Sequence, residues 1–168
     1  LNQFALHYQT GKPMPMDLVK RIEAASTFNE GFSTVETISS ALVDMQLHLL
    51  ENPDIDPKDF EAKTLYSLHM PHEIVMRHRI PQFGHIFSGD DYAAGYYGYL
   101  WADAISADAT EAFTVDGKGL YDKEVAKRLV KHVFSVGNSV DPEVAYPLFR
   151  GKKSTTDALM RARNFPIK

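Results

Sequence analysis

Apolar side chains recur every three or four positions along most of the chain, which is the spacing of one face of an α-helix. The longest such pattern begins at Ser33, and Glu36 three residues later completes a capping-box arrangement. Its apolar positions are Val35, Ile38, Leu42, Met45 and Leu49. Together these patterns predict helices over residues 1–8, 17–25, 33–52, 58–70, 72–79, 92–113, 122–136, 142–149 and 156–163. No segment alternates convincingly like a β-strand, so the expected fold class is all-α.

Turn and cap residues are expected to set the ends of these helices. Asp17 and Asp122 stand where a side chain caps the first amide groups of a helix, and Pro142 fits a first helical position. Residues 83–91 are expected to form a loop because they contain Gly, Ser and paired aspartates. Since no internal repeat interrupts the pattern, we expect residues 1–168 to form a single all-helical segment.

The tyrosines are concentrated in one stretch, residues 81–101. Four of the eight tyrosines of the chain lie there, at positions 92 to 99. On a helix that begins at Tyr92, the side chains of Tyr92, Tyr96 and Tyr99 lie within about 40° of one another and share a face. His85 precedes them on the expected loop. A phenol donates a hydrogen bond without adding charge at neutral pH, which suits a site that stabilises a developing oxyanion.

A second interpretation of the same stretch is structural. Tyrosine and tryptophan also fill protein cores with their polar tips satisfied at the edge. Gly95 and Gly98 favour the first interpretation, because a glycine lets a ligand or another backbone approach closely. On the residues alone both interpretations stay open.

Composition excludes several classes of function. The 168 residues include 44% hydrophobic ones, which suffices for the core of one ordinary domain. The net charge of −4 and the scattered basic residues argue against nucleic acid and anionic membranes as partners. The chain has no cysteine, so disulfides and thiolate metal sites are excluded. No apolar run is long enough for a transmembrane helix.

The histidines do not form a recognisable metal motif. No His-Glu-x-x-His sequence occurs in the chain, and Met76 stands where the second histidine after His72–Glu73 would be. His72 and His78 are six positions apart, a poor spacing for two ligands on one helical face. We therefore expect this chain to supply no metal ligand.

Three arginines allow two interpretations. Arg77 and Arg79, on either side of His78, suit the carboxylate of a ligand because guanidinium groups pair with carboxylates in a bidentate way. They suit structural ion pairs equally well. Arg150, directly before Gly151, is expected to hold the chain end against the domain.

The stretch from His85 to Trp101 resembles the signature near the C-terminus of the thimet-oligopeptidase family of zinc peptidases. The matching residues are His-Ile-Phe-Ser-Gly at 85–89 and Tyr-Ala-Ala-Gly-Tyr-Tyr-Gly-Tyr-Leu-Trp at 92–101. Shorter family motifs are resembled by Tyr-Gln-Thr-Gly-Lys-Pro at 8–13, Phe-Asn-Glu-Gly-Phe at 28–32, Met-Arg-His-Arg at 76–79 and Phe-Arg-Gly at 149–151. The resemblance thus extends along nearly the whole chain.

The resemblance implies roles for four side chains. In that family two histidines of a His-Glu-x-x-His helix and a glutamate hold a zinc ion, upstream of the region that matches this chain. By position, Tyr99 corresponds to the tyrosine that hydrogen-bonds the oxyanion of the scissile carbonyl, and Tyr92 to a second tyrosine near the reacting bond. His85 corresponds to a loop histidine that contacts the substrate backbone, and we assign Tyr96 to substrate binding. Asp90 and the following aspartate occupy a position where many relatives have one glycine.

Three functions are compatible with these residues. The first is the C-terminal part of a zinc-dependent oligopeptidase or peptidyl-dipeptidase that acts on short peptides, with its upstream half as partner and a cytoplasmic or else periplasmic location. The Ala-Ala-Gly and Met-Arg-His-Arg sequences favour the dipeptidyl type. The second is an autonomous all-α module that binds peptides without hydrolysing them, and the third is a subunit that completes a peptidase in trans. Under the first, this chain alone is expected to bind no zinc, to be inactive, and to self-associate through an apolar patch along the tyrosine helix.

Overall fold

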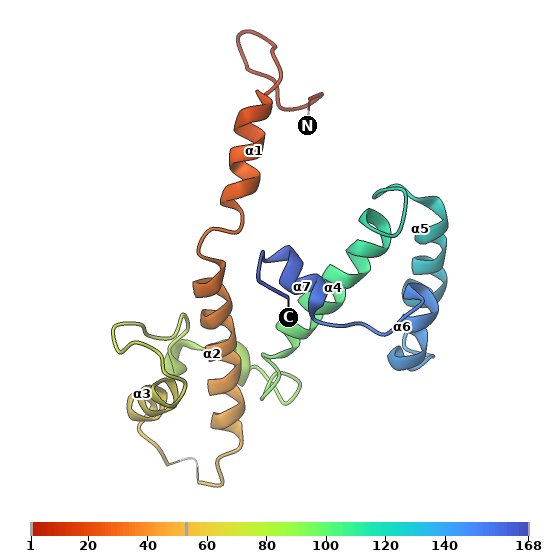
Figure 1. Cartoon of the computed structure of the whole chain (residues 1–168). Helices are drawn as coiled ribbons and strands as arrows, with labels where there is room; N and C mark the ends of the chain where they lie inside the picture. Colours follow the sequence, from red (N-terminus) through yellow and green to blue (C-terminus); the bar gives the residue numbers. More distant parts are fainter. Residues whose placement is uncertain (1, 53, 168) are drawn as a thin grey trace. The chain divides into compact units, whose positions relative to one another are not determined.

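A computed structural model describes residues 2–52 and 54–167 (Figure 1). Over these residues the chain forms helices and one isolated antiparallel bridge, between Leu6 and Pro13, and it forms no β-sheet. The all-α prediction is therefore confirmed. The α-helices are α1 (Met16–Ala25), α2 (Glu30–His48), α3 (Pro57–Ser67), α4 (Gly98–Thr114), α5 (Lys123–Leu129), α6 (Pro142–Arg150) and α7 (Asp157–Ala162). Shorter turns are the 3-10 helices η1 (Ile80–Gln82) and η2 (Gly84–Phe87) and the π-helical η3 (Val130–Phe134).

The chain divides into two compact units, residues 1–33 and residues 34–168, with the boundary inside α2. In the first unit, α1 buries none of its residues. Its apolar positions Leu18 and Ile22 are 37% and 54% exposed. The single segment expected over the whole chain stays a prediction.

The helix predicted for residues 1–8 is wrong over its described part, residues 2–8. The amide of His7 donates to the carbonyl of Lys12 at 2.9 Å, so the chain folds back on itself in a tight turn. Gly11 adopts a φ of +62° in this turn, a left-handed conformation that glycine takes without steric cost. The apolar spacing of a short segment did not predict this reversal, because a turn is decided by backbone conformation rather than by the apolar period.

The predicted starts of α1 and α2 need correction, although both helices are present. Pro15 occupies the cap position of α1 and makes no side-chain cap bond, whereas Asp17 lies inside the first turn. The helix α2 begins at Glu30, so Ser33 and Glu36 lie within it and form no capping box at its end. Asn29, directly before α2, adopts a φ of +58°, which asparagine tolerates better than most residues.

The apolar positions predicted for α2 are only partly covered, and Ile38 and Met45 are the half-buried ones among them. Leu42 and Leu49 from that predicted face are 38% and 66% exposed, and Val35 is 47% exposed. The face that packs inward instead contains Val43 and Asp44, both fully buried. Tertiary contacts have therefore selected a different side of this helix from the one with the most regular apolar spacing.

In the second unit, α2, α3, η1 and η2 contribute to one core cluster. Its buried members are Val43, Leu65, Met76, Ile80, Phe83 and Ile86. The helix α3 is confirmed and is capped by Asp56, whose carboxylate accepts from the next turn's amides. The short helix predicted for residues 72–79 is wrong, because this segment runs as turns and bends that carry Met76 into the cluster.

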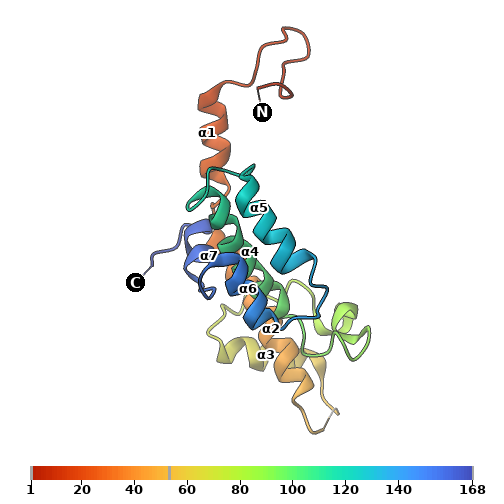
Figure 2. The same ribbon diagram turned by 90° about the vertical axis from the view of Figure 1, so that its right-hand side faces the viewer.

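The helices α4, α5 and α6 and the turn η3 contribute to a second cluster, in which Ala112, Val125 and Phe149 are buried. In both views α5 lies beside α6, and α7 packs against α4 (Figure 2). Arg161 of α7 binds Glu111 of α4 through two hydrogen bonds of 2.6 and 2.8 Å, and this hydrogen bonding holds the pKa of Glu111 below its usual value. The helices predicted over residues 122–136, 142–149 and 156–163 are confirmed, with η3 continuing α5.

The helix predicted for residues 92–113 begins only at Gly98, the first residue of α4. Residues 92–97 form successive turns, in which Ala94 has a φ of +54°. At Gly95 a Cβ atom would lie 3.1 Å from the carbonyl oxygen of Tyr92, so a side chain there would crowd the turn. Among the described helices, none is long and apolar enough to cross a membrane.

Candidate functional site

The four site residues predicted from the sequence lie together. His85 is in η2, Tyr92 and Tyr96 are in the turns before α4, and Tyr99 is in the first turn of α4. The ring of His85 lies 4.7, 5.9 and 5.8 Å from the rings of Tyr92, Tyr96 and Tyr99 respectively. The hydroxyl of Tyr99 lies 3.1 Å from Nε2 of His85, within hydrogen-bonding distance. We call these four residues the tyrosine–histidine cluster.

The reason for this grouping differs from the one predicted. The three tyrosines do not share a helical face, because only Tyr99 belongs to α4. Their rings converge instead because the turns fold the segment around His85. The four residues therefore lie together through a different local geometry from the one predicted, and their roles in binding and catalysis stay predictions.

The tyrosine–histidine cluster presents phenols to solvent over an apolar base. Tyr92 and Tyr99 are 46% and 53% exposed, whereas Tyr96 is half-buried and packs against the core cluster. The ring of Tyr96 meets that of Phe83 edge-on at 4.9 Å. Tyrosines whose rings are partly packed and partly exposed can donate hydrogen bonds from their hydroxyl groups to a carbonyl oxygen of a ligand.

Sequence reasoning missed two residues that hold this segment, Asp44 and His48 of α2. Asp44 is fully buried, and its carboxylate accepts hydrogen bonds from the amides of Ala94 and Tyr96 at 3.1 and 2.9 Å. Nδ1 of His48 lies 2.8 Å from the same carboxylate. Asp44 and His48 are four positions apart on α2, but nothing in this spacing indicates which distant amides they face.

The Met-Arg-His-Arg segment has a structural role at Arg79. Its guanidinium binds the carboxylate of Glu61 at 2.8 Å, and the Glu61 side chain is only 2% exposed. The ring of His78 packs against Phe83 at 5.3 Å. Arg77 is 65% exposed and 3.9 Å from Glu36. For Arg79, the ion-pair interpretation is therefore the correct one.

A second polar cluster joins α4 to α6 around the buried Asp108. Its carboxylate accepts from the Tyr146 hydroxyl at 2.7 Å and from Nε of Arg150 at 3.1 Å. Arg150 also donates to Asp116, which lowers the pKa of that carboxyl. Burial, together with the hydrogen bond to Asp108, raises the pKa of Tyr146 well above its ordinary value. Arg150 thus has a structural role that anchors the end of α6 to α4, whereas a role in holding the chain end stays a prediction.

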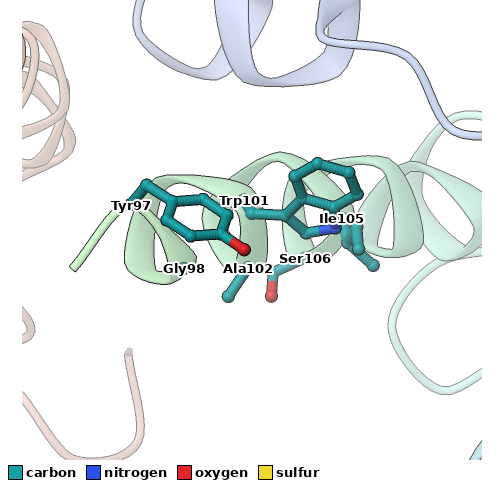
Figure 3. A pocket seen from close by; sticks show the side chains of 6 residues that line it. All are labelled: Tyr97, Gly98, Trp101, Ala102, Ile105 and Ser106. Carbon is teal, nitrogen blue, oxygen red and sulfur yellow. The ribbon is translucent and has the colours of Figure 1, made fainter. Parts of the chain in front are cut away.

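Two open hollows lie beside α4 and contain none of the four predicted site residues. The first, of about 470 Å³, follows one face of α4 and is lined by Tyr97, Gly98, Trp101, Ala102, Ile105 and Ser106 (Figure 3). The second, of about 510 Å³, lies between α4, η3 and α6 and shares Trp101 and Ile105 with the first. Trp101 is 66% exposed, so this face of α4 is apolar and uncovered.

The described residues do not fit a zinc site. Over residues 2–52 and 54–167 there is no group of three or more His, Cys, Asp or Glu side chains that could hold a metal ion. His72 and Glu73 contact each other at 3.1 Å on the surface, with the histidine side chain 90% exposed. A zinc site of the kind that the resemblance implies needs ligands from elsewhere.

Comparison with known proteins identifies the family. Residues 1–165 match Peptidase family M3. The chain is 38% identical over 168 residues to the dipeptidyl carboxypeptidase of Escherichia coli, covering 98% of this chain and 24% of that protein. It is 34% identical to the oligopeptidase A of the same organism, over 92% of this chain and 22% of that protein. A probable cytosolic oligopeptidase A of Arabidopsis thaliana is also 34% identical, over 96% of this chain and 23% of the relative.

The chain spans about a quarter of the length of these curated relatives, while its own length is matched almost throughout. The match includes the tyrosine–histidine cluster and the residues of α2 that hold it. The chain belongs to Peptidase family M3.

Proposed function

We propose that this chain is the C-terminal portion of a peptidase that hydrolyses short peptides, and that it supplies substrate-binding and oxyanion-stabilising side chains. The observation that carries the proposal is the 3.1 Å contact between Tyr99 and His85 in a chain that belongs to a peptidase family. The names and lengths of the relatives support a longer protein of this activity.

In this proposal Tyr99 donates its hydroxyl hydrogen to the carbonyl oxygen of the scissile bond as negative charge develops there. Such a donor stabilises the transition state more than the ground state. The hydrogen has to point at the substrate, so the contact with His85 has to run from Nε2–H of the imidazole to the phenol oxygen. His85 thereby orients the phenol, while its other side faces the ring of Tyr92.

Tyr92 and Tyr96 are assigned to substrate binding and positioning. Tyr92 is exposed beside His85, where its hydroxyl can reach a bound peptide. Tyr96 lies 5.1 Å from Tyr99, ring to ring, and is wedged against Phe83. It therefore limits how the ring of Tyr99 can move.

The zinc ion that the family uses is assigned to residues outside this chain, because the described residues do not fit it. The chain's own contribution is restricted to binding, orientation and hydrogen bonding. Uncovered apolar positions on α1, α2 and α4 support the idea that more protein packs here. They are Leu18, Ile22, Val35, Leu42, Leu49 and Trp101.

The test uses the protein as its gene encodes it and the 168-residue chain side by side. With a quenched fluorescent peptide, the gene-encoded protein is expected to hydrolyse and the chain alone to be inactive. Elemental analysis is expected to find zinc only in the gene-encoded protein. Stoichiometric zinc held by the chain alone, or peptide hydrolysis by it, overturns the proposal. Peptide binding by both forms without hydrolysis by either would support the alternative, an autonomous binding module.

Two finer points belong to the same proposal. Because dipeptidyl carboxypeptidases are among the relatives, at 38% and 36% identity, we assign the activity to release of C-terminal dipeptides. Mass spectrometry of the products of a short peptide distinguishes this from internal cleavage. We assign the protein to the cytoplasm. Cell fractionation would distinguish this location from the periplasm.

A further inference from the structure

A buried carboxylate of α2 accepts hydrogen bonds from the backbone that carries the tyrosine–histidine cluster. The side chain of Asp44 is fully buried. One of its oxygens accepts from the amide of Ala94 at 3.1 Å, and the other accepts from the amide of Tyr96 at 2.9 Å. Fifty residues or more separate the carboxylate from these amides. These bonds therefore fix a tertiary relation that no local sequence preference provides.

His48 completes the surroundings of this carboxylate. Its Nδ1 lies 2.8 Å from Oδ1 of Asp44 and 3.3 Å from the amide nitrogen of Ala94. Nδ1 also lies 3.0 Å from the main-chain carbonyl oxygen of Asp44. With a proton on Nδ1, the imidazole donates to these Asp44 oxygens, and the Ala94 amide donates to the carboxylate. Both carboxylate oxygens of the buried Asp44 are thus hydrogen-bonded, as a buried charge requires.

The turn that Asp44 holds does not have a conformation that its residues favour on their own. Ala94 has a φ of +54°, a left-handed conformation in which the Cβ atom crowds the following carbonyl oxygen. At Gly95 the Tyr92 carbonyl oxygen approaches so closely that a side chain would crowd it. A turn of this kind persists only where surrounding contacts determine it, and Asp44 supplies two of them.

The other end of the segment is held in a similar way by α3. Glu61, only 2% exposed, accepts from Arg79 at 2.8 Å and from the amide of Ile80 at 3.4 Å. The 3-10 turn that carries His85 begins four residues later, at Gly84. Of the two carboxylates, Asp44 acts more directly on the cluster, because it accepts hydrogen bonds from amides of the turn that carries Tyr92 and Tyr96.

We infer that Asp44 is a positioning residue of the peptidase site, which holds the turn at 94–96 so that Tyr92, Tyr96 and Tyr99 converge on His85. It touches no substrate in this role and acts through the backbone. The inference rests on the proposed function for its catalytic consequence. The anchoring itself is a property of the fold and is measurable without activity.

The test is the isosteric variant Asp44→Asn in the protein as its gene encodes it. The asparagine side chain keeps one acceptor oxygen, but its NH₂ group replaces the other. This NH₂ group faces a backbone N–H, which is also a donor, so one of the two hydrogen bonds is lost. We expect amide hydrogen exchange in residues 92–97 to become about tenfold faster, since each tenfold corresponds to 1.4 kcal/mol of opening free energy. We expect kcat to fall about 10–100-fold, with a smaller change in KM, because misplaced groups cost mainly transition-state stabilisation.

Asp108→Asn is the matched control. Asp108 is equally buried and accepts from Tyr146 and Arg150, but it belongs to the other polar cluster. This control is expected to lower the melting temperature while leaving exchange in residues 92–97 unchanged and kcat close to wild type. If Asp44→Asn proves too unstable, His48→Ala removes one donor and keeps the carboxylate, and it is expected to act in the same direction with smaller effects.

Unchanged exchange in residues 92–97 of Asp44→Asn overturns the inference, and so does an equal loss of kcat in Asp108→Asn. Failure of the proposed function is recognised separately, as a wild-type protein that hydrolyses no peptide. In that case the exchange measurement alone decides whether Asp44 anchors the turn, and faster exchange supports it.

Discussion

At the scale of single residues, the contact between Tyr99 and His85 is the feature most closely tied to function. The two residues are 14 positions apart, and their side chains meet at 3.1 Å because the intervening turns reverse the chain. Both side chains were predicted from the resemblance, but their contact was not, since it depends on the positions of α2 and η2. The polar groups that hold them, Asp44 among them, are visible only in the structure.

Replacing Tyr99 by phenylalanine removes one hydroxyl and keeps the ring. We expect Tyr99→Phe to lower kcat about 10²–10³-fold with little change in KM, as for the loss of one oxyanion donor. Tyr97→Phe is the control, because Tyr97 lies two positions away on the hollow of α4 and outside the tyrosine–histidine cluster. Steady-state kinetics on a quenched peptide measure both variants, and equal losses in the two would contradict the assignment of Tyr99.

The hydroxyl of Tyr146 is expected to make the unfolding free energy of the protein decrease at alkaline pH. Its pKa is raised above the ordinary value of 10.0 by burial and by the bond to Asp108, so its contribution to stability is complete below about pH 10 and is lost as the pH rises further. Tyr146→Phe should lower the unfolding free energy at pH 8 by about 1 kcal/mol. Urea unfolding at pH 8 and pH 11 should show this difference shrinking, and a difference that does not change with pH would count against it.

At the scale of elements, the ends of helices follow local chemistry where a cap side chain is present. Asp122 and Asp141 bind the first amides of α5 and α6, and Asp56 does so for α3. The start of α4 has no such cap, and its prediction was wrong by six residues. There the Asp44 carboxylate accepts from the amides of Ala94 and Tyr96. A helix beginning at Tyr92 would use the Tyr96 amide internally, so the carboxylate competes with helix formation at that position.

Asp122 offers a test of capping. Its carboxylate accepts from the amides of Lys118, Glu124 and Val125, and these bonds lower its pKa. Asp122→Ala should lower the melting temperature by roughly 2–4 °C near neutral pH. Because the folded-state pKa is lowered, the difference should disappear as the pH falls below about 4.

Thr156→Ala provides the control for Asp122→Ala in the same thermal melts. Thr156 occupies the cap position of α7 but makes no side-chain cap bond, so its replacement should leave the melting temperature nearly unchanged. Equal shifts in the two variants would show that capping is not the cause.

At the scale of the whole chain, several helices leave apolar residues uncovered. On α2 these are Val35, Leu42 and Leu49, and on α4 Trp101 is 66% exposed. A regular apolar stripe normally marks the face that packs against other protein. The relatives are about four times as long as this chain. We therefore expect the additional residues of the longer protein to cover these apolar positions.

For the isolated 168-residue chain, this exposure predicts self-association with a second copy through the face of α4. Sedimentation velocity should show a concentration-dependent increase in mass, and emission from Trp101, the only tryptophan, should shift to shorter wavelength as it is buried. Trp101→Glu should reduce the association, whereas Tyr121→Glu, at a position 96% exposed outside that face, should not. A wild-type chain that stays monomeric at all concentrations would disprove this prediction.

The sequence by itself determined the all-α class, most of the helices and the identity of the cluster residues. Helix class follows from local spacing and capping, and Tyr92, Tyr96, Tyr99 and His85 lie in one short stretch whose resemblance to a known family is specific. The tertiary structure alone decided which face of α2 is buried, where α4 begins and how the four side chains meet. These depend on hydrogen bonds that the Asp44 carboxylate accepts from amides 50 and 52 residues away, and no local pattern contains such a bond.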